Sequence, residues 1–204
     1  MTKAILTAFM LICAVSTNLH AAGNAKAGEE KSMSCQGCHG TDGNSPASMW
    51  PTLAGQSENY LIKQIKDFQS GARTDDTMPS MVSGLSDQDI ADISAYFSSK
   101  KAKASGASDD EGLITLGKKI FKGGNSESRL MACAGCHGAN AQGNNAAKFP
   151  SLIGQQSEYV LNQLQNFASG TRSNDMNKMM RNIATRMSQK EMEAVAAYLA
   201  TLSH

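Results

Sequence analysis

The sequence has 204 residues, which is room for one large domain or two small ones. Hydrophobic residues make up 41% and aromatic residues only 5%, so two small domains would have marginal cores unless a large apolar cofactor filled each of them. The formal net charge of +1 lacks the basic excess of a nucleic-acid-binding protein and argues against that class of partner.

The chain begins with a segment typical of a secretory signal peptide. A lysine precedes an apolar run over residues 4–15, and small residues around Ala21 offer a cleavage site. The run is shorter than the roughly 20 residues that a membrane span needs, which favours cleavage over anchoring. We therefore predict that residues 1–21 are removed, taking Cys13 and His20 with them, and that the mature protein lies in the periplasm.

Two Cys-x-x-Cys-His motifs account for every cysteine of the predicted mature chain: Cys35, Cys38 and His39 in the first half, and Cys133, Cys136 and His137 in the second. Two cysteines three residues apart on a helical turn face the same way, so both can form thioethers with the vinyl groups of one haem. The histidine that follows then points a ring nitrogen at the iron. The pattern predicts two covalently bound haem c groups, each with a histidine as axial ligand.

Three other interpretations of the cysteine pairs are weaker. A four-cysteine zinc site would join pairs that lie about 95 residues apart and would leave both histidines without a role. A thioredoxin-like motif needs a strand–helix–strand context that the sequence lacks. Two local disulfides are possible in an exported protein, but such a short bridge is strained.

The two halves of the chain are copies of each other. The matched residues of the first copy are Pro51–Gln56, Tyr60, Gln64, Phe68 and Arg73, and those of the second are Pro150–Gln155, Tyr159, Gln163, Phe167 and Arg172. A repeat of about 100 residues is too long for a solenoid unit and indicates duplicated domains. We predict an N-terminal domain over 22–101, a small, polar linker over 102–112 and a C-terminal domain over 113–204.

Helical periodicity predicts an all-α fold for both copies. One apolar face comprises Leu61, Ile65 and Phe68 in the first copy and Val160, Leu164 and Phe167 in the second. Capping boxes, Ser86 with Asp89 and Ser188 with Glu191, open a last helix in each copy. The apolar stripes of these last helices are Ile90, Ile93 and Phe97, and Met192, Val195 and Leu199.

The sixth ligand of each iron can be approached by elimination. His20 is lost with the signal peptide and His204 is the last residue, so a second histidine at both irons is impossible. Methionine, lysine or an open position remains. There are 12 methionines, and they cluster between the two helices of each copy.

The repeat selects two of these methionines. Met78 and Met180 each lie seven residues before the segment that opens the last helix, and no other pair among these clustered methionines occupies matching positions. Met81, Met176 and Met179 are nearby rivals. A thioether ligand favours ferrous iron and fills the sixth position, which indicates electron transfer rather than catalysis.

The stretches that follow the first motif and surround the helices give a family resemblance. They are Gly40–Pro46, Tyr60–Gln64, Leu85–Asp89 and Ala95–Phe97 in the first half, and Phe121–Gly124 with Met180 and Arg181 in the second. With them the whole mature chain resembles the dihaem cytochromes c of the c4 type. That family consists of two tandem class I cytochrome c domains, each wrapped round one covalently bound haem.

The resemblance implies further roles. Met78 and Met180 are implied as axial ligands, and Pro51 and Pro150 match the proline whose carbonyl accepts a hydrogen bond from the axial histidine. The resemblance also implies haems that face each other through their propionate edges. The loop between Gly71 and Met78 is shorter than its counterpart in the second copy, which departs from strict repetition.

For function, the resemblance implies a periplasmic shuttle of single electrons from a respiratory donor complex towards a terminal oxidase. The family is often loosely held at the membrane, and we expect a monomer. A haem subunit of a larger dehydrogenase, for instance one paired with a flavoprotein, is the main alternative. A dihaem peroxidase or a gas sensor would need an open iron, and a sensor also an output domain.

Charge differs between the two halves of the mature chain. Residues 22–105 hold 8 Lys and Arg against 10 Asp and Glu, whereas residues 106–204 hold 10 against 8. Such an asymmetry can orient a protein towards a charged partner.

Overall fold

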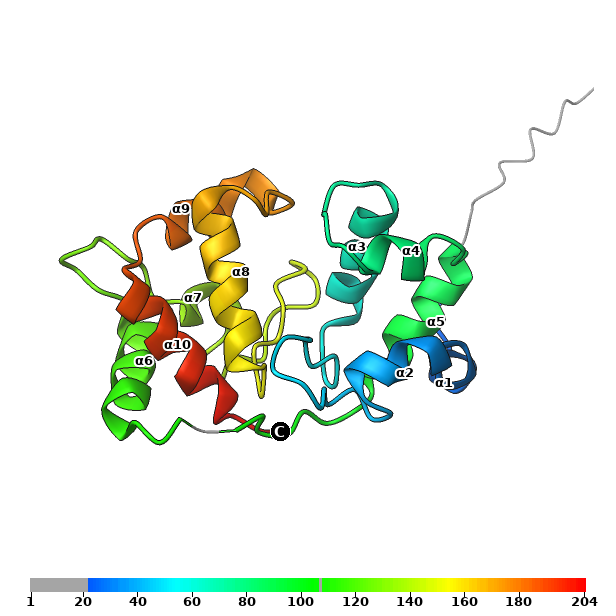
Figure 1. The fold of residues 1–204 in the computed structure, drawn as a ribbon, viewed down its shortest axis with the longest axis horizontal. Coiled ribbons are helices and arrows are strands. Elements are labelled where there is room, and N and C mark those ends of the chain that lie inside the picture. The colour runs from blue at the N-terminus through cyan, green and yellow to red at the C-terminus, as the bar shows by residue number, and fades with distance from the viewer. Residues whose placement is uncertain (1–21, 107) are drawn as a thin grey trace, which may run out of the picture.

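The computed structural model describes residues 22–106 and 108–204, which form two helical domains side by side (Figure 1). The first contains α1 (Ala25–Lys31), α2 (Met33–His39), α3 (Glu58–Gln69), α4 (Met78–Val82) and α5 (Asp87–Ser98). The second contains α6 (Glu111–Gly123), α7 (Ala134–His137), α8 (Ser157–Ser169), the 3₁₀ turn η1 (Met176–Lys178), α9 (Met179–Ala184) and α10 (Gln189–Ala200).

The predicted all-α fold is confirmed. Apart from two isolated bridges, the described part of the chain contains no β-structure. The predicted signal peptide, with Cys13 and His20, lies outside the described residues. None of the described helices is long and apolar enough to span a bilayer.

Both predicted capping boxes form. The Ser86 hydroxyl accepts from the Asp89 amide while the Asp89 carboxylate accepts from the Ser86 amide, and Ser188 and Glu191 repeat the arrangement. Each box satisfies two amide groups that the first turn of a helix leaves without partners. Helices α5 and α10 therefore begin at their predicted positions.

The first and last helices of each domain cross at a glycine. Helix α1 packs against α5 and α6 packs against α10. A Cβ atom at Gly28 would lie 1.9 Å from the carbonyl oxygen of Asp92, and one at Gly117 would lie 1.9 Å from that of Ala194. Only glycine allows the two helix backbones to approach so closely.

The apolar cores follow the predicted stripes with one exception. All six stripe residues of α5 and α10 are buried, and so are the three predicted residues of α8. In α3, Leu61 and Phe68 are buried, but Ile65 is only partly so. Gln64, next to Ile65, is buried as well, and its side-chain oxygen accepts a hydrogen bond from Arg172 of the other domain.

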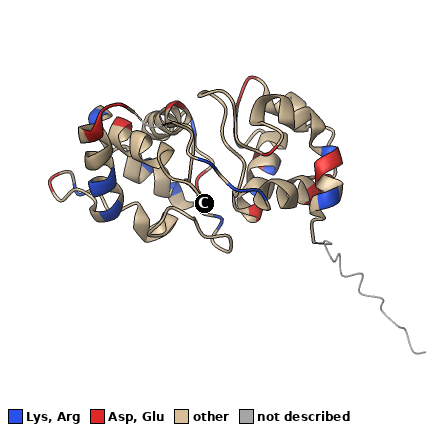
Figure 2. Ribbon diagram, turned by 90° about the horizontal axis from the view of Figure 1, so that it is seen from below, with Lys and Arg blue, Asp and Glu red and all other residues tan. Residues whose placement is uncertain are grey.

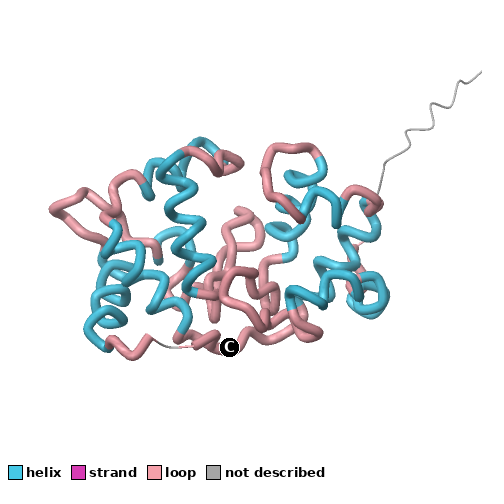
Figure 3. Tube along the Cα trace, viewed as in Figure 1, coloured by secondary structure: helices cyan, strands magenta, loops and turns pink. Residues whose placement is uncertain are grey.

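Loops, rather than helices, meet at the centre of the molecule (Figure 3). The described residues of the span 102–112 run beneath them and are held at several points. Lys103 donates to Asn44 in the first domain, and Ser105 donates to the carbonyl of Ala200 in the second. Ala102 is buried and Glu111 already belongs to α6, so this span is partly structured.

Candidate functional site

The first cysteine motif lies on α2. Its histidine is buried, and the Nδ1 atom of His39 is 2.8 Å from the carbonyl oxygen of Pro51. In the second motif, Nδ1 of His137 is 3.0 Å from the carbonyl oxygen of Pro150. A carbonyl oxygen only accepts, so Nδ1 carries the proton in each ring and Nε2 is left to bind a metal.

Burial lowers the pKa of both His39 and His137, which favours the neutral ring that iron requires. Burial likewise raises the pKa of Cys35, and it raises that of Cys133 to about 11. All four cysteines of the described chain are free of disulfides. The described residues also hold no cluster of three or more metal-binding side chains, so the zinc interpretation gains no support.

The methionines differ in exposure. Met78 begins α4 and Met180 lies in α9, and both are partly buried. Met81 and Met176 are 43% and 49% exposed, whereas Met179 is partly buried like the two favoured residues. Met180 also packs against the same core cluster as Cys133.

The two methionine loops are held differently. In the first domain a carboxylate oxygen of Asp75 accepts from the amide of Met78 at 2.9 Å. In the second, Asp175 pairs with Arg181 at 2.7 Å, and Asn177 and Lys178 adopt left-handed backbone conformations. The longer second loop noted in the sequence is accommodated by these two left-handed residues and η1.

Polar residues shared by the two copies form a reciprocal contact between the domains. Arg73 donates to Gln64 in its own domain and to Tyr159 and Gln163 in the other. Arg172 donates to Gln163 in its own domain and to Tyr60 and Gln64 in the other. The repeat in the sequence includes all of these residues but assigns them no role. The tyrosines and glutamines lie on α3 and α8, and the arginines lie in the loops that follow these helices.

The two arginines suit a cofactor that carries carboxylates. The guanidinium carbon of Arg73 lies 4.6 Å from the ring centroid of Phe68. Phe68 belongs to the face of α3 that is buried in its domain. In the described part of the chain, neither Arg73 nor Arg172 forms an ion pair with a protein carboxylate. A haem would supply both the apolar disc for the domain core and the missing anions.

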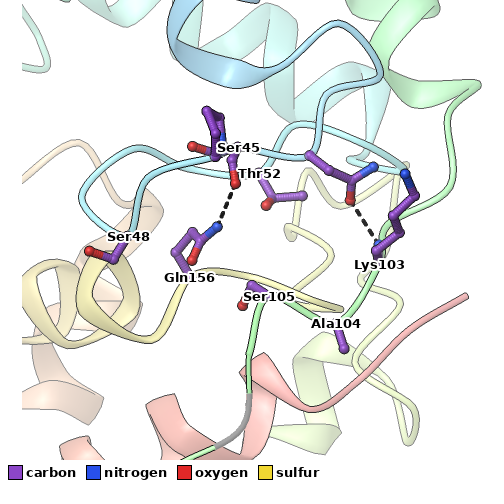
Figure 4. Close-up of a pocket in the computed structure, with 9 residues that line it drawn as sticks. Ser45, Ser48, Thr52, Lys103, Ala104, Ser105 and Gln156 are labelled. Carbon is purple, nitrogen blue, oxygen red and sulfur yellow. Dashed lines mark hydrogen bonds between the residues drawn. The ribbon is translucent and has the colours of Figure 1, made fainter.

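A polar cavity of about 360 Å³ lies where the linker meets both domains (Figure 4). Its lining includes Ser45, Thr52 and Gln156, and Gln156 donates to the Ser45 carbonyl at 2.8 Å. The linker contributes Lys103–Ser105. The cavity belongs to the domain boundary and does not include either cysteine motif.

Comparisons with known proteins agree with this geometry. The family model described as Cytochrome c matches residues 25–101 and 114–203. Cytochrome c4 of Pseudomonas aeruginosa is 43% identical, with 96% of each chain covered. The crystal structure of reduced recombinant cytochrome c4 from Pseudomonas stutzeri superposes with a TM-score of 0.84 at 43% identity, covering 89% of this chain and 100% of that one.

The chain is also similar to proteins that are named as electron acceptors of a dehydrogenase. The thiosulfate dehydrogenase electron acceptor of Stutzerimonas stutzeri is 36% identical, over 83% of this chain and 79% of that protein.

Two helical domains, each with a Cys-x-x-Cys-His motif, define a double cytochrome c. The chain belongs to the cytochrome c family, among the dihaem proteins of the c4 type. It is a dihaem electron-transfer protein with two covalently bound haem c groups, and not an enzyme.

Proposed function

We propose that this chain shuttles single electrons in the periplasm, from a respiratory donor complex towards a terminal oxidase. The observation that carries the proposal is that each domain holds a buried histidine bonded through Nδ1 to a proline carbonyl, and also a partly buried methionine at the position that the repeat selects. Each haem, when bound, cycles between ferric and ferrous iron and so carries one electron.

Each domain would attach and ligate one haem through its own residues. Cys35 and Cys38 would anchor the first haem, with His39 and Met78 as its axial ligands. Cys133, Cys136, His137 and Met180 would do the same for the second. Pro51 and Pro150 hold the histidine rings in one tautomer and orientation through their carbonyls. From the repeat we propose an N-terminal domain over 22–101, a linker over 102–112 and a C-terminal domain over 113–204.

Exposed methionines beside the motifs favour docking of redox partners there. Met33 and Met131 each lie two residues before a motif and are 72% and 67% exposed. Lys and Arg positions are spread over the helices of the C-terminal domain (Figure 2), which has the basic excess found in the sequence. We expect this domain to dock against an acidic partner. The protein itself is proposed to be a monomer, with at most peripheral membrane association.

The ligand assignments can be tested by potentiometric titration of the exported holoprotein. Wild type should show two one-electron steps, both at positive potential. Met78→His and Met180→His should each move one step to a much lower potential, because a thioether favours ferrous iron more than an imidazole does. Met176→Leu and Met179→Leu should leave both steps in place. A step that stays positive in Met78→His or Met180→His contradicts that assignment.

A second candidate is the acceptor of a sulfur-oxidising dehydrogenase. The 36% identity to a thiosulfate dehydrogenase electron acceptor favours it. Mixing the oxidised protein with a thiosulfate dehydrogenase and thiosulfate distinguishes the two: rapid reduction with saturable kinetics supports this partner, whereas reduction only by a respiratory donor complex supports the first proposal.

A further inference from the structure

A hydrogen-bonded chain leads from each haem-motif histidine across the domain boundary. Nδ1 of His39 donates to the carbonyl of Pro51 at 2.8 Å. The amide of Thr52 belongs to the same peptide unit, and it donates to Oε1 of Gln155, in the C-terminal domain, at 2.8 Å. One planar peptide group thus joins the histidine of one domain to a glutamine of the other.

The second domain repeats the arrangement in the opposite direction. His137 donates to the carbonyl of Pro150 at 3.0 Å, and the amide of Ser151 donates to Oε1 of Gln56, in the N-terminal domain, at 2.8 Å. The proline peptides and the glutamines of both arrangements fall within the matched segments 51–56 and 150–155, so the repeat supplies the same groups in each domain.

Each glutamine is fixed in its orientation by a further bond. Nε2 of Gln155 donates to the carbonyl of Thr52 at 2.9 Å, and Nε2 of Gln56 donates to that of Ser151 at 2.9 Å. Because a carbonyl can only accept, the amide oxygen of each glutamine must face the peptide N–H. In this orientation the amide oxygen and the amide nitrogen of each glutamine are both bonded, and so are the peptide N–H and the carbonyl that face them.

The contact is buried. Gln56 and Gln155 are each 5% exposed, and Thr52 and Ser151 are each 4% exposed. Away from water, hydrogen bonds in series polarise one another. A bond accepted from the peptide N–H increases the negative charge on the carbonyl oxygen of the same peptide, since resonance couples the two. That oxygen then accepts more strongly from the histidine.

We propose that each haem is tuned from the opposite domain: Gln155 acts on the haem of the N-terminal domain and Gln56 on that of the C-terminal domain. Both are positioning residues that act through a peptide group, and the inference rests on the proposed axial roles of His39 and His137. A stronger bond at Nδ1 makes the imidazole a better electron donor, which stabilises ferric iron and lowers the reduction potential.

The test is a crossed effect on the two potentials. Gln155→Leu removes the acceptor at similar volume, and should raise the potential of the N-terminal haem while leaving that of the C-terminal haem unchanged. Gln56→Leu should do the reverse. Titration of the full-length holoprotein gives both values, and the Met78→His and Met180→His variants identify which step belongs to which haem.

Gln156→Leu is the matched control. Gln156 is also buried at the boundary and donates across it, to the carbonyl of Ser45, but it does not touch either proline peptide. Its loss should weaken the domain contact and leave both potentials in place. Should Gln155→Leu fail to assemble, Gln155→Asn withdraws the oxygen while keeping the site polar, and the same shift is expected.

The inference is overturned if Gln155→Leu shifts both haems equally, shifts only the haem of its own domain, or shifts neither. It is also overturned if Gln156→Leu produces the same shift. Failure of the proposed ligands has a different signature, because Met78→His or Met180→His would then leave the wild-type steps unchanged whatever the glutamine variants do.

Discussion

Lys31 joins the first helix of the N-terminal domain to the last through two carboxylates. Its ammonium lies 2.7 Å from an oxygen of Asp89 and 2.7 Å from one of Asp92. The bond from Lys31, followed by those from Ser86, lowers the pKa of Asp89 to about 2. The Asn24 amide and then Lys31 lower the pKa of Asp92. Both acids therefore favour the folded protein only while they are ionised.

We predict that this contact is lost in acid. A carboxyl with a depressed pKa contributes stability that is complete above its unfolded value of 3.8 and disappears as the pH falls towards 2. Asp89→Asn should lower the thermal midpoint at pH 6, and its difference from wild type should shrink as the pH falls through this window. Asp109→Asn, outside the contact, is the control. A difference that stays constant with pH contradicts the assignment.

At this scale, residues whose role depends on local spacing could be predicted from the sequence. The cysteines and histidine of each motif act within five consecutive residues, so haem attachment can be predicted before the fold is known. Gln56 and Gln155 act on peptides 95 and 103 residues away, and only the packing of the domains reveals the contact. Met179 illustrates the limit, because its burial matches that of Met180.

Helices with capping boxes were predictable because the signal is contained in four residues. The crossings of α1 with α5 and of α6 with α10 were not, since a glycine within a helix normally indicates weakness rather than close packing. Gly28 and Gly117 are informative only once the opposing carbonyl is known.

Substitution of these glycines should destabilise the domain that contains them. Alanine favours an isolated helix over glycine by about 1 kcal/mol. At Gly28 and Gly117, however, the added Cβ would overlap a backbone carbonyl at 1.9 Å and force the helices apart. We expect Gly117→Ala to cost about 3 kcal/mol, measured by denaturant unfolding. Gly123→Ala, which meets nothing within 4 Å, should cost nothing; equal losses in the two variants would refute the crossing.

The domain contact is reciprocal in its arginines and glutamines but not in its charges. Lys63 and Asp67 pair on α3, whereas the repeat places Asn162 and Asn166 at the matching positions of α8. The ammonium of Lys63 donates to the carbonyl of Asn174 at 2.9 Å, and the side chain of Asn174 donates to Asp67. The loop that leads to Met180 is thus held by the other domain in addition to its own Asp175–Arg181 pair.

The corresponding loop of the first domain is held locally. Asn174 matches Asp75, whose carboxylate accepts from the amides of Thr77 and Met78. The two methionine loops should therefore differ in how far their order depends on the domain contact. The two methionine loops of this duplicated sequence are therefore held by different contacts.

Hydrogen exchange can measure that inequality. Asp67→Asn removes a charge-assisted bond of about 1.5 kcal/mol, so amides in 173–180 should exchange roughly tenfold faster while those in 74–79 stay unchanged. The double variant Asp67→Asn with Asn174→Asp exchanges carboxylate and amide, and should restore slow exchange because the pair can bond again and Lys63 gains a partner. Asn166→Ala, at the matching position of α8, should alter neither loop. Equal acceleration of both loops, or no rescue by the double variant, would show that Asp67 supports the interface as a whole rather than the second loop.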